Sequence, residues 1–149
     1  MLTLRTLGQR EARAALGVGL AMAQERSLLM AFAVADRWGA LIACERMDGT
    51  PSRNLTHAIR KAFTSGEMGR DTTLFADQLR ERSGDLVQWG NPMLTTLAGG
   101  CVVQKDGEVL GAVACGGAAR RDRYRDREGD GGRSGRMTTP RSCLHLPFA

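Results

Sequence analysis

The stretch GGCVVQKDGEVLGAVACGG, from Gly99 to Gly117, constrains the fold of this chain more than any other part of it. Two apolar runs flank Asp106-Gly107. Asp-Gly is a preferred dipeptide for a type I′ turn, because both central residues of that turn need a positive φ. The stretch therefore predicts a β-hairpin. Gly-Gly closes each of its ends, and a glycine at a strand end lets either another backbone or a ligand approach closely.

The chain ahead of the hairpin predicts one helix followed by two strands. Small and apolar residues recur at helical spacing from about Leu7 to Gln24, and Thr6 and Gln9 have the spacing of a capping box. LLMAFAVAD, residues 28–36, is too continuously apolar for a half-exposed strand, so we expect a buried central strand. A turn at residues 37–39 and a second strand over residues 40–46 follow.

Two further helices are expected between the strand pair and the hairpin. MDGTPS, residues 47–52, has the composition of a loop. From Asn54 an apolar stripe at helical spacing predicts the second helix. The third begins near Thr72, with Asp71 or Thr72 as its cap, and residues 83–98 are expected to be irregular.

The sequence changes character after Ala118. Residues 119–149 are rich in Arg, Asp and Gly and carry too few apolar side chains to offset the entropy lost on ordering. We therefore expect one domain over residues 1–118 and an atypical, disordered tail over residues 119–149. Much of the net charge of +5 lies in that tail. Nucleic-acid binding is therefore not expected, because a basic patch would have to form on the folded part.

Bulk features favour a protein of the cytoplasm without a metal centre. No apolar run is long enough to span a membrane, and no secretory signal is visible at the N-terminus. The four cysteines show no C-x-x-C spacing. We expect them to be reduced and mostly buried, as small hydrophobic side chains.

Three motifs in this order resemble the GlcG/HbpS family of haem-binding and haem-degrading proteins, which includes the C-terminal domains of PduO-type proteins. The motifs are ERMDGTP, then KAFT (residues 61–64), then LAGGCVVQKDGEVLGAVACGG. The resemblance runs from about Leu2 to Gly117. It implies an α/β (α+β) fold in which an antiparallel sheet is flanked by helices in a profilin-like or PAS-like arrangement. It also implies a homo-oligomer that binds haem.

The candidate site residues gather around the second helix and the hairpin. His57 and Lys61 are four residues apart and share a helix face; His57 is a candidate haem ligand, and Lys61 a candidate partner for a propionate or a substrate carboxylate. A solvated His57 and a surface Lys61 are the alternatives. Asp48 lies in a loop at a strand end, where sites are often built. Cys101 and Cys115 flank the hairpin and could ligate haem as thiolates, but a buried structural role is favoured. Our candidate cofactor-binding residues are His57, Lys61, Met47, Arg70, Gly99 and Gly100, and the candidate catalytic residues are Lys61 and Asp48.

Three hypotheses of function follow from these residues. The first is an oligomeric protein that binds haem or a small anionic ligand between the hairpin, the loop of residues 47–49 and the helix bearing Lys61. The second is an enzyme of small-molecule catabolism or biosynthesis that uses the same pocket. The third is a non-catalytic accessory subunit. The first two require a hollow between hairpin and helix; if these two elements pack flush and leave no room for a ligand, both hypotheses fail and only the accessory role remains.

Overall fold

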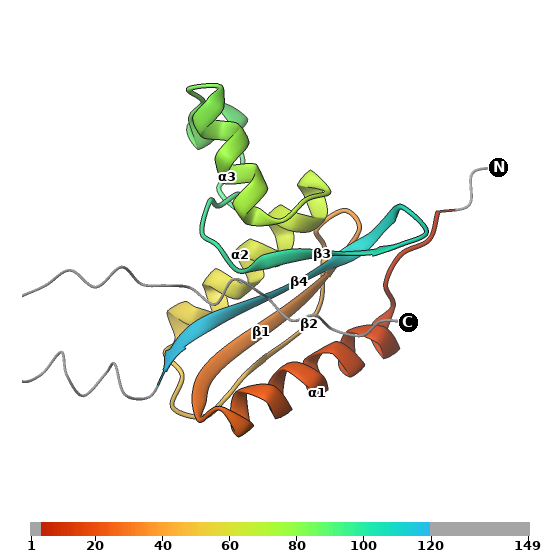
Figure 1. The fold of residues 1–149 in the computed structure, drawn as a ribbon, viewed down its shortest axis with the longest axis vertical. Helices are drawn as coiled ribbons and strands as arrows, with labels where there is room; N and C mark the ends of the chain where they lie inside the picture. Colours follow the sequence, from red (N-terminus) through yellow and green to blue (C-terminus); the bar gives the residue numbers. More distant parts are fainter. Residues whose placement is uncertain (1–3, 120–149) are drawn as a thin grey trace, which may run out of the picture.

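A four-stranded antiparallel sheet with helices on both faces forms the body of the molecule (Figure 1). The computed structural model describes residues 4–119. The helices are α1 (Gln9–Glu25), α2 (Ser52–Met68), α3 (Thr72–Glu81) and the short 3-10 helix η1 (Leu86–Trp89). The strands are β1 (Leu28–Asp36), β2 (Leu41–Arg46), β3 (Gly100–Lys105) and β4 (Glu108–Ala119), in the spatial order β2-β1-β4-β3. The predicted α+β fold, an antiparallel sheet flanked by helices, is confirmed.

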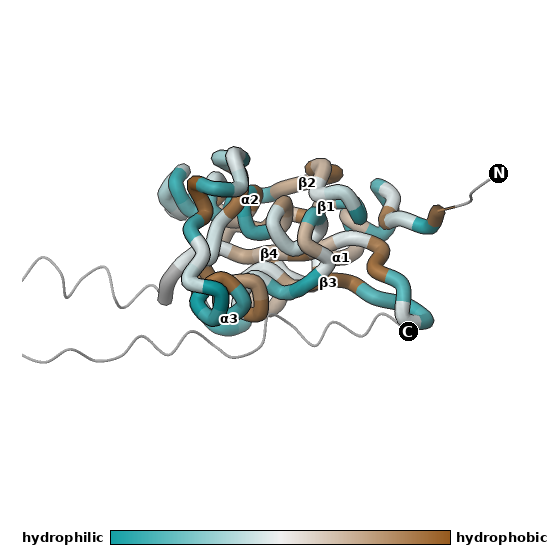
Figure 2. Tube along the Cα trace, turned by 90° about the horizontal axis from the view of Figure 1, so that it is seen from above, coloured by the Kyte–Doolittle hydropathy of each residue, from teal (hydrophilic) through white to brown (hydrophobic). Residues whose placement is uncertain are grey.

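Strands β1 and β4 form the centre of the sheet, as the apolar sequence of residues 28–36 predicted. Their residues alternate between two apolar clusters. Phe32, Val34 and Val113 pack with α1 on one face, while Ala33, Ala35 and Ala114 pack with α2 on the other. In Figure 2 the strands are pale to brown, and teal residues lie mainly on helices and turns. The face toward α2 is therefore built from alanines, which lets the helix approach the sheet closely.

The hairpin has the turn that its sequence predicted. Asp106 and Gly107 have φ of 54° and 78°, so both central residues are left-handed, as a type I′ turn requires. Strand β4 runs through Ala119, which pairs with Leu28 of β1. The strand thus extends one residue into the segment that we expected to be disordered. The rest of that prediction, residues 120–149, lies outside the described residues.

The start of α1 differs from the sequence prediction. The helix is capped at Gly8, whose N–H donates to the carboxylate of Glu11 (3.1 Å). Hydrogen bonds to backbone N–H groups lower the pKa of Glu11. Thr6, our expected cap, instead donates its hydroxyl to the carbonyl of Leu110 (3.2 Å) and accepts from the N–H of Arg37 (3.3 Å). A tertiary contact with the hairpin has replaced the local cap.

The start of α3 is shared with the edge of the sheet. Asp71 is the N-cap residue, as expected, but its side chain makes no cap hydrogen bond. Its carboxylate accepts from the N–H of Val102 (2.9 Å), and the hydroxyl of Thr72 accepts from the N–H of Gly100 (3.1 Å). These side chains satisfy outward-facing donors of the edge strand β3, which would otherwise be open to another chain. Among residues 4–119, no helix is long and apolar enough to cross a membrane.

Candidate functional site

Helix α2 packs directly against β3 and β4 along the part of the helix that bears Asn54 and Lys61. A Cβ added at Gly116 would lie 2.3 Å from the carbonyl oxygen of Asn54, and one at Gly100 would lie 2.6 Å from that of Lys61. Both distances are far below a van der Waals contact. These two glycines therefore serve helix–strand packing, and our expectation of a pocket between the hairpin and the part of this helix that bears Lys61 is wrong. Haem binding can no longer be argued from that pocket.

The K-A-x-T motif of α2 joins the helix to the sheet and to the segment before β3. The Nζ of Lys61 donates to the carbonyl of Cys115 on β4 (2.9 Å), and the side chain is buried. Ala62 is fully buried against the alanines of β1 and β4. The hydroxyl of Thr64 donates to the carbonyl of Arg60 (2.8 Å) and accepts from the N–H of Thr95 (3.0 Å). In this structure the motif therefore serves the packing of α2 against the sheet.

The glycine pair at the start of β3 is part of the same packing. Gly99 has a φ of 117°, and a Cβ there would lie 3.1 Å from both the Nζ of Lys61 and the carbonyl oxygen of Cys115. Gly100 is buried. Neither glycine faces space that could receive a ligand, because Lys61 and α2 already occupy it.

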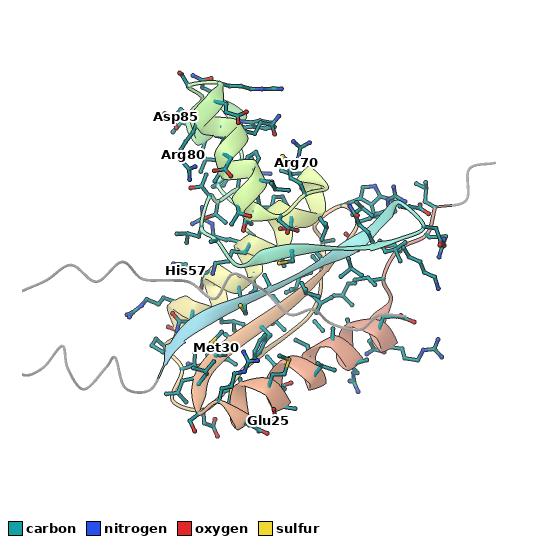
Figure 3. The ribbon with its side chains drawn as sticks, in the orientation of Figure 1. Glu25, Met30, His57, Arg70, Arg80 and Asp85 are labelled. Atoms are coloured by element: carbon teal, nitrogen blue, oxygen red, sulfur yellow. The ribbon has the colours of Figure 1, made fainter. Side chains whose placement is uncertain are left out.

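His57 and Arg70, two of the predicted ligand-binding residues, are far apart. His57 lies in the N-terminal half of α2 and is half-buried, whereas Arg70 follows the C-terminus of that helix and is exposed (Figure 3). Thirteen residues separate them, which corresponds to roughly 20 Å along a helix. Arg70 donates from Nε to the carbonyl of Met68 (3.1 Å) and from its guanidinium to Gln78. The structure therefore does not bring these two residues into one site.

The loop that follows β2 is a turn that hydrogen bonds to β1 hold in place. The N–H of Met47 donates to the carbonyl of Met30 (3.0 Å), and the buried Thr50 donates its hydroxyl to the same carbonyl (3.2 Å). Gly49 has a φ of 77°, which explains the glycine. Asp48 is exposed in this turn. Met47 is half-buried against the cluster beneath α1, on the opposite face of the sheet from the cluster of α2.

An open cavity of about 570 Å³ lies at the other end of α2, where no site was expected. It is lined by the C-terminal turn of α2, the hairpin turn and the residues around them: Arg37, Gly66, Glu67, Met68, Gly69, Asp106, Gly107, Glu108 and Val109. Arg37 and Glu108 form a part-buried ion pair there (2.6 Å). This charged lining does not match the apolar faces of a haem. Within residues 4–119, no three His, Cys, Asp or Glu side chains form a group that could hold a metal ion.

The fold and its motifs define a small α+β domain in which helices flank an antiparallel sheet, and sequence comparison places it in a family. The model of the HbpS-like family, described as haem-degrading proteins, matches residues 7–123. Protein GlcG of Escherichia coli is 33% identical over 113 residues, which cover 76% of this chain and 83% of GlcG. The chain belongs to the HbpS-like family.

Solved structures share the fold. A double mutant of Streptomyces reticuli HbpS superposes with a TM-score of 0.71 at 25% identity, covering 85% of this chain and 84% of HbpS. Klebsiella pneumoniae ORFY gives a TM-score of 0.71 at 21% identity, over 79% of this chain and 83% of that protein. A structure described as a PduOC:heme complex gives 0.67 at 18%, over 78% and 86% of the two chains.

Proposed function

We propose that this protein binds haem. The observation that carries the proposal is membership of a family described by haem degradation, joined to the same fold in a solved haem complex. A haem site needs an apolar surface for the macrocycle and an axial donor such as imidazole, thiolate or thioether. The described chain offers these donors half-buried, in His57, Met47, Cys101 and Cys115.

Titration with hemin tests this function directly. We expect the full chain at micromolar concentration to take up hemin with a shift of the Soret band that saturates at a fixed stoichiometry. Circular dichroism of the same samples checks that the fold is intact. A folded protein that leaves the hemin spectrum unchanged would contradict haem binding.

The geometry gives the enzyme hypothesis less support than the haem hypothesis. Lys61 is buried and donates a hydrogen bond to the carbonyl of Cys115, whereas Arg70 lies beyond the C-terminal end of α2. Asp48 is exposed in the turn after β2. An anionic substrate held by Lys61 and Arg70 together would have to span nine residues, which corresponds to roughly 14 Å along a helix. Haem binding is therefore the form of the proposal that we adopt.

Self-association of the chain is a second proposal, carried by the arm that α3 and η1 form away from the sheet (Figure 1). Large apolar side chains on this arm are exposed, including Val87 at 81% and Leu74 at 59%. Trp89 packs edge-on against the buried Phe75 (ring centroids 5.6 Å apart), yet is half-exposed itself. Burial of such a patch against a second copy would remove apolar surface from water.

Replacing both Leu74 and Val87 by serine is expected to shift the chain from oligomer to monomer. The loss of two apolar contacts in each interface weakens association by at least tenfold. Sedimentation velocity on the full chain measures the change. Leu41→Ser, which alters an exposed apolar residue of β2 away from the arm, is the matched control. A wild-type chain that is monomeric at all concentrations would refute the proposal.

A further inference from the structure

The edge strand β3 is closed along its outer side by two side chains at the start of α3. The hydroxyl of Thr72 accepts from the N–H of Gly100 (3.1 Å) and donates to the carbonyl of the same residue (3.4 Å). The carboxylate of Asp71 accepts from the N–H of Val102 (2.9 Å). Three backbone groups that a further strand would use are therefore already bonded to side chains.

The two edges of the sheet differ in how well they would accept another strand. Strand β2, at one edge, ends in the exposed charged residues Glu45 and Arg46, and charged side chains discourage pairing at an edge. Strand β3, at the other edge, has the sequence GCVVQK and carries no charge before Lys105. Short apolar segments without charge pair readily with copies of themselves. The side-chain cover thus lies on the edge that is more prone to pair.

The two covering residues belong to the base of the arm that α3 and η1 form away from the sheet (Figure 1). The connector from α2 to α3 begins at Gly69, which has a φ of 61°, and a Cβ added there would meet no atom within 4 Å. Helix η1 moves with α3, because Trp89 packs on Phe75. A change in the direction of the arm at this connector would therefore draw Asp71 and Thr72 off β3 together.

We propose that the base of the arm is an autoinhibitory latch on the β3 edge. While Asp71 and Thr72 are bonded to β3, the strand cannot pair further; when the arm moves away, the β3 edges of two copies pair as antiparallel strands. This inference is independent of haem binding, and it uses a different surface from the exposed patch of Leu74 and Val87.

The positions of the released groups favour a second copy of β3 as the occupant. A two-fold axis at Cys101 places Gly100 opposite the Val102 of the second copy, so that each released N–H meets a carbonyl. In this register the two copies of Cys101 face each other as a pair without backbone hydrogen bonds, with Cα atoms about 4.5 Å apart. That separation lies within the range of about 4.4–6.8 Å that a disulfide spans. A disulfide between two copies of Cys101 therefore reports the pairing.

The test is disulfide trapping in the full chain carrying Cys44→Ser and Cys143→Ser, which leaves Cys101 and Cys115. The variant Asp71→Ala/Thr72→Val removes both acceptors, whereas Asp71→Asn/Thr72→Ser keeps an acceptor oxygen at each position. Asp77→Ala is the matched control on the same helix, because the carboxylate of Asp77 pairs with Arg80. After mild oxidation with diamide, electrophoresis without reductant and mass spectrometry of the linked peptides measure the dimer.

We expect Asp71→Ala/Thr72→Val to form at least tenfold more dimer linked through Cys101 than the parent chain, because two hydrogen bonds that hold the latch are lost. Asp71→Asn/Thr72→Ser and Asp77→Ala should match the parent. A folded Asp71→Ala/Thr72→Val chain without added linkage, or one linked through Cys115, would overturn the latch.

The single variant Thr72→Val keeps the test decisive if the double variant does not fold. Valine has the shape of threonine without its hydroxyl, so only the bonds to Gly100 are lost. We expect the amide hydrogen of Gly100 to exchange with solvent at least tenfold faster than in the wild type, and to exchange at the wild-type rate in Thr72→Ser. Unchanged exchange in Thr72→Val would show that Thr72 does not close the edge.

Discussion

Replacing Gly116 by alanine is expected to lower the free energy of unfolding by about 3 kcal/mol and the melting temperature by about 10 °C. The added Cβ would lie 2.3 Å from the carbonyl oxygen of Asn54, so α2 must move away from β4. That movement would also disturb the bond between Lys61 and Cys115. Chemical denaturation followed by circular dichroism measures the loss.

Gly17→Ala is the matched control for this substitution. Gly17 is exposed on α1. A Cβ added there would have no atom within 4 Å apart from its own helix backbone and chain neighbours. Because alanine is the better helix former, we expect a gain of up to about 1 kcal/mol. Equal effects at Gly116 and Gly17 would contradict close packing between α2 and β4.

The second large effect is expected at Lys61. Lys61→Ala removes a buried aliphatic stem together with a hydrogen bond to Cys115, and we expect a loss of about 2–3 kcal/mol in the free energy of unfolding. Lys61→Met should recover part of the loss, because it restores the stem without the ammonium group. Denaturation curves of the two variants provide the comparison.

The other lysine of the chain, Lys105, supplies the control. It is exposed at the end of β3, so Lys105→Ala is expected to change stability by less than about 0.5 kcal/mol. A Lys61→Ala chain as stable as the wild type would show that Lys61 does not hold the helix to the sheet. Lys61 would then again be a candidate for binding a ligand.

Local patterns predicted the elements well because each left a strong signal in the sequence. The run over residues 28–36 is apolar on both faces, and β1 is buried on both faces for that reason. Asp106-Gly107 predicted its turn from backbone preference alone. Helix α2 was predicted to begin at Asn54 and begins at Ser52. Residues 83–98, expected to be irregular, contain the single turn of η1.

The arrangement of the site could not be read in the same way, because it depends on tertiary contacts. A glycine at a strand end suits a ligand and a helix backbone equally well, and only the positions of Asn54 and Lys61 decide between them. The spacing of His57 and Lys61 places them on one face of α2. It does not reveal that the face toward Lys61 is closed by β4.

The surroundings of the two hairpin cysteines could be predicted only in part. Cys101 and Cys115 were known from the sequence, and the alternation of β3 and β4 could have placed them on one face with Val103 and Val113. That α1 packs against β1 and β2 and leaves β3 uncovered depends on the crossing of helix and sheet. No short-range pattern in the sequence encodes that crossing.

Nuclear magnetic resonance of the hemin-bound chain tests most directly on which face the haem lies. The paramagnetic iron broadens the methyl signals near it. If the haem avoids the face of the sheet that α2 closes, the methyl signals of Ile59, which packs on the α2 side, stay sharp while methyl signals elsewhere broaden or shift. Broadening confined to Ile59 would contradict the account.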